Sequence, residues 1–156
     1  MKRKLLSLLM LLMTAATGAW AETVTWNSTN VFNNSHKDDE LNKWRPTPLN
    51  YEGITISFSG TGVSRFMPYY DGKASLACYG GDGDSFTFTA PSGKLFYKVE
   101  INDNVYINFT AYGDWTKPNN KKIVWRGTPA STVTLGGSNS TFADDLNSIV
   151  FTLKDE

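Results

Sequence analysis

Residues 84–111 read DSFTFTAPSGKLFYKVEINDNVYINFTA, and this stretch decides the fold class. Apolar and polar residues alternate in three runs, which are separated by Pro-Ser-Gly at 91–93 and Asn-Asp-Asn at 102–104. Because successive side chains of a strand point to opposite faces, the pattern predicts three antiparallel strands with one buried face and one polar face. The positions expected on the buried face are Phe86, Phe88, Ala90, Tyr97, Val99, Ile101, Val105, Ile107, Phe109 and Ala111.

The sequence on both sides of this stretch predicts more short strands and no long helix. The strands are expected at 23–26, 54–58, 63–67, 75–79, 122–126, 131–135 and 149–153, with turns at 68–72 and 80–84 and longer connections at 27–50 and 112–120. We therefore predict an all-β domain, an antiparallel β-sandwich of about nine short strands in a jelly-roll-like order. In that order the first and last strands lie side by side. A closed β-barrel is the alternative.

The same alternation predicts which side chains form the hydrophobic core. They are Ile54, Ile56, Phe58, Phe86, Phe88, Val99, Ile101, Ile107, Phe109, Trp125, Ile149, Phe151 and Leu153. Trp26 also alternates with polar neighbours and is expected in the core. Cys78 is the single cysteine, so no internal disulfide supports the fold, and its small and apolar neighbours favour a buried thiol over a reactive one.

The first 21 residues have the pattern of a signal peptide. Lys2, Arg3 and Lys4 precede an apolar run at 5–13, and Ala19-Trp20-Ala21 places small residues where a signal peptidase cleaves. Cleavage leaves residues 22–156 as one domain in an exported protein, which is extracellular, surface-associated or periplasmic. The alternative is an N-terminal membrane anchor, but the apolar run is too short for stable membrane insertion.

Charge and ligand chemistry exclude several classes of partner. Removal of the first segment takes three positive charges from a chain with 15 basic and 15 acidic residues, and the longest basic run is Lys121-Lys122. Nucleic acid is therefore not an expected partner. With one histidine, His36, and one cysteine, a zinc or copper site cannot be assembled. Asp82 and Asp84 are weak calcium candidates, an ion-free acidic turn is favoured, and no cofactor is predicted.

The second half of the chain resembles a β-sandwich module of secreted and surface proteins of gut-dwelling bacteria, over about residues 84–153. The segments that carry the resemblance are Phe86–Phe88, Ala90–Lys94, Lys98–Ile101, Trp115, Val124–Gly127 and Ser148–Leu153. The resemblance implies a sandwich of the carbohydrate-binding or adhesin-like type. It does not imply a particular activity.

Aromatic residues in the turns and connections form the candidate binding site. An even number of strands between the 68–72 turn and the 112–120 connection predicts that both lie at one end of the sandwich. Their aromatic rings would stack on a sugar, and their carboxylates would accept hydrogen bonds from its hydroxyls. The site comprises Trp115, Tyr69, Tyr70, Asp71, Asp114 and, from the long connection, Trp44. The alternative is that the tryptophans fold back as lids over the core.

These features favour an exported, non-catalytic module that binds a glycan or a surface protein of a host or cell. A protein–protein assembly module that pairs through exposed strand edges is the second interpretation. A small glycoside hydrolase is the third interpretation. It would need two carboxylates held across a cleft, whereas the candidate acids all lie in turns: Asp71, Asp82, Asp84 and Asp114. The adjacent Ser35, His36 and Asp38 are not expected to form a catalytic triad.

Overall fold

The computed structural model describes residues 21–32, 49–60, 65–70, 73–78, 83–137 and 140–156. These residues form three antiparallel sheets and one short π-helix, η1 (Ser28–Phe32). The front sheet has the order β1 (Glu22–Asn27), β13 (Leu146–Asp155), β7 (Lys94–Asp103), β10 (Lys122–Trp125) and β9 (Trp115–Asn119). The back sheet has the order β11 (Thr132–Gly136), β6 (Ser85–Thr89), β3 (Ile54–Ser59) and β2 (Leu49–Tyr51). The end sheet has the order β4 (Arg65–Tyr70), β5 (Lys73–Cys78), β12 (Thr141–Ala143) and β8 (Ile107–Phe109).

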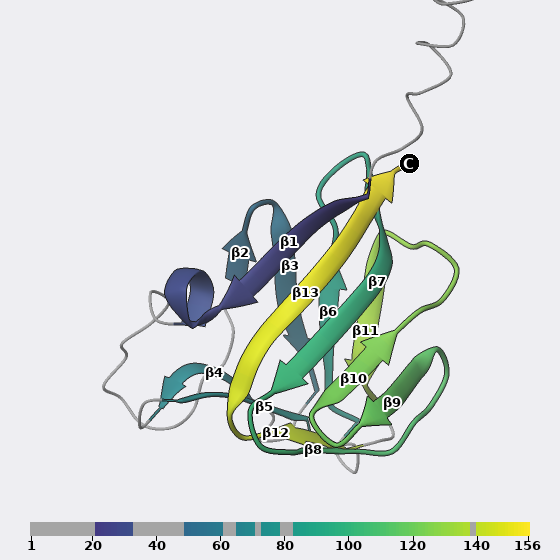
Figure 1. Cartoon of the computed structure of the whole chain (residues 1–156). Coiled ribbons are helices and arrows are strands. Elements are labelled where there is room, and N and C mark those ends of the chain that lie inside the picture. Colours follow the sequence, from purple (N-terminus) through teal and green to yellow (C-terminus); the bar gives the residue numbers. More distant parts are fainter. Residues whose placement is uncertain (1–20, 33–48, 61–64, 71–72, 79–82, 138–139) are drawn as a thin grey trace, which may run out of the picture.

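The front and back sheets pack face to face, and the end sheet runs across one end of the sandwich (Figure 1). Phe151 on β13 lies at the centre of the core. Its ring centroid is 5.1 Å from that of Trp26, 5.4 Å from that of Phe88 and 5.6 Å from that of Phe96. Phe88 belongs to the back sheet and the other three rings to the front sheet, so one aromatic cluster joins the two layers.

The fold class predicted from the sequence is confirmed. The first and last strands lie side by side, in a register that runs from Glu22 opposite Leu153 to Asn27 opposite Ser148. None of the three sheets closes on itself among the described residues, so the closed-barrel alternative is wrong. The structure has three strands that were not predicted. β2 and β12 are only three residues long and leave almost no alternation in the sequence, and β9 lies where a connection was expected.

The predicted core is also confirmed, with one residue at its margin. Twelve of the thirteen expected side chains are buried, together with Trp26 and Cys78. Phe58 is half-buried and packs against the core, with its ring centroid 5.6 Å from that of Phe86. The Cys78 thiol donates a hydrogen bond to the Asp84 carbonyl oxygen at 3.0 Å. Cys78 is thus a buried free thiol, as expected, and the core has no internal disulfide.

Three expected inward positions of the central stretch are wrong. Tyr97 is 46% exposed and Phe96 is buried in its place, because β7 and β13 shift register between the pairs Lys98–Thr152 and Phe96–Leu153. An extra residue at this bulge reverses the alternation. Val105 is 62% exposed in a turn, and Ala111 lies beyond the end of β8 and is exposed.

The long connection at 27–50 is described only at its two ends, where η1 and β2 lie. The side-chain amide of Asn30 in η1 turns back onto the outer edge of β1. Its Nδ2 donates to the Thr25 carbonyl oxygen at 2.7 Å, and its Oδ1 accepts from the Asn27 backbone N–H at 2.9 Å. The amide therefore occupies backbone groups that a neighbouring strand would otherwise use.

Candidate functional site

The structure places the described backbone of the predicted rim in two different sheets, with Tyr69 and Tyr70 in the end sheet and Trp115 in the front sheet. Tyr69 and Tyr70 lie in strand β4 rather than in a turn, and β4 forms one edge of the end sheet. Asp114 lies directly before β9, which forms one edge of the front sheet. Trp44 and Asp71 lie outside the described residues.

Trp115 belongs to the core and not to a binding surface. It begins β9 opposite Trp125, on the inner face of the front sheet, and its side chain is only 2% exposed. The indole N–H donates to the Thr134 carbonyl oxygen at 2.8 Å. The neighbouring Tyr112 is half-buried, and its hydroxyl accepts a hydrogen bond from the Gly136 N–H. The prediction of an exposed Trp115 is wrong, because both rings fold back as lids.

Asp114 is exposed and lines a shallow groove on the outer face of the front sheet. This charged groove has a volume of about 560 Å³, and its lining residues are Lys98, Glu100, Gly113, Asp114, Thr116, Pro118, Lys122, Val124 and Arg126. Six of the nine come from β7, β9 and β10, whose outward side chains alternate with the buried core positions. Gly113 and Asp114 lie just before β9, and Arg126 lies just after β10. Asp114 and Trp115 are the predicted site residues whose side chains the structure describes, and of these two Asp114 lines a depression.

Glu100 lies between two lysines in the charged groove. Its carboxylate is 2.7 Å from the Lys98 ammonium and 3.2 Å from the Lys122 ammonium. Burial raises the pKa of Glu100, but the hydrogen bonds and charges of the two lysines outweigh burial and hold this pKa below its ordinary value. Glu100 is therefore ionised at neutral pH.

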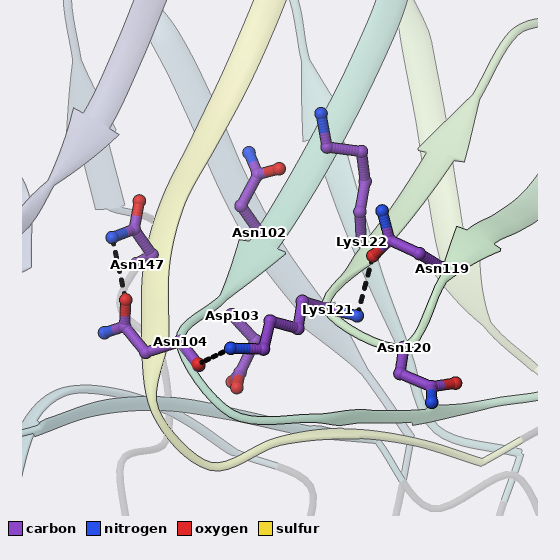
Figure 2. A pocket seen from close by; sticks show the side chains of 8 residues that line it. All are labelled: Asn102, Asp103, Asn104, Asn119, Asn120, Lys121, Lys122 and Asn147. Atoms are coloured by element: carbon purple, nitrogen blue, oxygen red, sulfur yellow. Dashed lines mark hydrogen bonds between the residues drawn. The ribbon is translucent and has the colours of Figure 1, made fainter.

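A second depression, the asparagine depression, lies beside the groove where two turns meet (Figure 2). Its volume is about 650 Å³. The first turn follows β7, the second joins β9 to β10, and β13 contributes Asn147. The lining residues are Asn102, Asp103, Asn104, Asn119, Asn120, Lys121, Lys122 and Asn147. Five of these eight side chains are amides, so the surface is polar but carries little net charge.

Asp103 holds two turns together beneath the asparagine depression. Only 5% of the residue is exposed. Its Oδ1 accepts the backbone N–H groups of Val105 at 2.7 Å and Tyr106 at 2.8 Å, while Oδ2 accepts the N–H of Asp145 at 2.9 Å. A short polar side chain that binds the backbone two and three residues ahead is typical of a tight turn. The carboxylate therefore fixes backbone and is not offered to a ligand.

Side chains above Asp103 form a connected set of hydrogen bonds. Asn147 donates to the Asn104 side-chain oxygen at 2.9 Å, and Asn104 donates to the Asp145 carboxylate at 3.0 Å. The Lys121 ammonium donates to the Asn104 carbonyl oxygen at 2.7 Å (Figure 2). The backbone N–H of Lys121 donates to the Asn119 side chain at 2.9 Å. These bonds orient the lining of the depression before any ligand is present.

Two asparagines keep polar groups directed toward solvent. The side-chain N–H of Asn102 donates to the Ser148 hydroxyl at 3.2 Å, which leaves the side-chain oxygen of Asn102 available as an acceptor. The Asn120 amide points away from the other side chains drawn in Figure 2. Beside them, Tyr106 is 48% exposed, and the Lys117 ammonium lies 4.3 Å from its ring centroid. Amides, an ammonium group and one exposed ring thus meet at this end of the front sheet.

Sequence reasoning missed this depression because its residues have the composition of turns. The Asn-Asp-Asn run at 102–104 and the Asn-Asn pair at 119–120 were each sufficient to explain a turn. The available signal was that two amide-rich turns occur at ends of adjacent strands of one meander. The backbone carbonyl oxygen of Asn120 accepts a hydrogen bond from the Ile107 N–H at 2.7 Å. The two turns therefore lie close together.

Metal binding finds no support at the predicted calcium position. Asp84 is fully buried and lies against Gly60, whose φ of +136° suits glycine. Asp82 and His36 lie outside the described residues. Within the described ranges, no group of three or more acidic, histidine or cysteine side chains is arranged to hold a metal ion.

Comparison with known proteins gives no family to which the chain can be assigned: no family model, curated protein or solved structure matches it. No helix among the described residues is long and apolar enough to cross a membrane.

Proposed function

We propose that this protein is an exported, non-catalytic binding module that takes a glycan at the asparagine depression. The observation that carries the proposal is the lining of that depression, where five amides and two lysines surround a hollow of about 650 Å³. Export rests on the signal-peptide pattern of residues 1–21, and N-terminal sequencing of the secreted protein should give Glu22 as its first residue.

Amide side chains suit sugar hydroxyls because both groups donate and accept hydrogen bonds. An asparagine offers two N–H donors and one acceptor oxygen, so adjacent hydroxyls of one sugar ring can bond to a single amide. Asn102 and Asn120 supply these groups, and Lys122 adds a donor.

Strand-edge assembly is less well supported at the front sheet. On β1, the Asn30 amide already bonds the outward Thr25 carbonyl and Asn27 N–H. On β9, at the opposite edge, Pro118 has no N–H to offer a neighbouring strand. Both features disfavour addition of a strand from another chain.

Hydrolysis is also less well supported than binding. A general acid needs a carboxyl group whose pKa is raised, whereas the lysines beside Glu100 hold its pKa below the ordinary value. Asp103 accepts three backbone N–H groups and does not face a substrate. Glu100 and Asp103 therefore stabilise the folded chain through their lysine and backbone partners.

A glycan array followed by calorimetric titration with the best-bound glycan tests the proposal. The double substitution Asn102→Ala with Asn120→Ala should weaken binding at least about ten-fold, because it removes several hydrogen bonds to the ligand. Asn108→Ala is the matched control, since Asn108 is an exposed amide on β8 outside the depression. A chain that binds no glycan, or a double variant that binds as well as the control, would contradict the proposal.

A further inference from the structure

The charged groove and the asparagine depression form one continuous surface. Lys122 lines both of them, on the outer face of β10. Its Cα partner on β7 is Asn102 and its partner on β9 is Asn119, both of which line the asparagine depression. The next outward residues along β7 and β10, Glu100 and Val124, line the groove. A ligand longer than one sugar unit would therefore extend from the depression onto the groove.

The groove carries more positive than negative charge although the chain as a whole has equal numbers of basic and acidic residues. Its cations are Lys98, Lys122 and Arg126, and its carboxylates are Glu100 and Asp114. Glu100 is in contact with both lysines, so two positive charges share one negative charge.

Arg126 is the cation of the groove that is best placed to meet a ligand. It is exposed, and its guanidinium makes no ion pair within the described part of the chain. Its backbone N–H donates to the Asp114 carbonyl oxygen at 3.0 Å, which fixes the start of the side chain at the side of the groove. A guanidinium in this position offers two parallel N–H donors to a planar carboxylate or to a sulfate group.

We propose that the charged groove is the extension of the glycan site and takes a sugar unit that carries a negative charge. This inference rests on the proposed function and specifies its ligand class as an acidic oligosaccharide. The anionic group lies at Arg126, near the surplus charge of Lys98 and Lys122. Hydroxyls of the same unit bond to Asp114, which accepts hydrogen bonds, and to Thr116. The neighbouring unit occupies the asparagine depression.

Two matched pairs of polymers test this inference with the whole mature chain. Polygalacturonate and its methyl ester differ in the carboxylate, and dextran sulfate and dextran differ in the sulfate. The charged member of at least one pair should bind about ten-fold more tightly than its uncharged partner, with a preference that falls as salt is added. The pair that responds identifies the anionic group as a carboxylate or a sulfate ester.

Arg126→Gln should remove most of this preference. Lys154→Gln is the control, because it removes the same charge from β13 outside both depressions. Equal affinity within both pairs, or no binding to any of the four polymers, would overturn the acidic-ligand inference; the array result for the asparagine depression would still decide the proposed function. Equally tight binding of single-stranded DNA would also overturn it, since the groove would then recognise charge without sugar structure.

Discussion

The inner and outer faces of β7 follow the same alternation but differ in what determines their residues. On the inner face, Val99 and Ile101 are fully buried, and any change in their size disturbs the packing. On the outer face, Lys98, Glu100 and Asn102 contact solvent and one another. Folding requires only that the residues on the outer face be polar, and it does not determine which charges and amides occur there. The outer face of β7 is therefore the face on which to look for a function.

The largest expected effect is at the inner face. Phe151→Ala should reduce the free energy of unfolding by about 3–5 kcal/mol, because it leaves a cavity among three aromatic neighbours. Val150→Ala, one residue away on the outer face, should cost less than about 1 kcal/mol. Denaturant titration of both variants measures the difference. Equal losses at the two positions would mean that the faces of β13 are wrongly assigned.

A smaller effect is expected where a core residue also makes a polar contact. Trp115→Phe keeps an aromatic ring but removes the indole N–H, so the Thr134 carbonyl oxygen loses its 2.8 Å partner. The loss should be about 1–3 kcal/mol in the free energy of unfolding, measured by denaturant titration, with glycan binding unchanged. Loss of binding without loss of stability would instead return Trp115 to the binding site.

The smallest expected effect is on the outer face and depends on pH. The lowered pKa of Glu100 means that its ionised form stabilises the folded chain. That contribution is complete above the unfolded-state pKa and is lost as the pH falls through the lower folded-state pKa. The free energy of unfolding of Glu100→Gln should therefore decline less steeply than that of the wild type between about pH 6 and about pH 3. The difference should be less than about 1 kcal/mol, because the ion pairs of Glu100 with Lys98 and Lys122 lie near solvent.

Asp144→Asn is the control for this measurement, because Asp144 is an exposed carboxylate in the turn before β13. Urea midpoints across the pH range give the comparison. If the wild type and Glu100→Gln decline in parallel, the contacts with Lys98 and Lys122 do not contribute to folded-state stability.

Sequence reasoning predicts the fold well because burial repeats every second residue. Ile54, Phe86 and Ile149 each lie in such a run and each is buried. The prediction fails where the repeat is interrupted. At Tyr97 a bulge adds one residue to β7, and nothing in the local sequence distinguishes it from a regular strand.

The candidate site is less predictable because it depends on which turns meet. Asp114 was placed in a binding surface, and the structure puts it in the charged groove. Trp115, its neighbour, begins β9 on the inner face of the front sheet and is buried in the core. The asparagines at 102–104 and 119–120 come together through the pairing of β7 with β10, a contact that composition alone does not specify.

The three hydrogen bonds of the Asp103 carboxylate have a consequence for the rate at which a ligand binds. By holding the backbone at Val105, Tyr106 and Asp145, this one group fixes the turn that carries Asn104 and the turn that leads into β13, where Asn147 lies. The site then needs no slow rearrangement when a ligand arrives. Association should appear as a single exponential whose rate rises in proportion to ligand concentration, and differences in affinity between ligands should arise in dissociation.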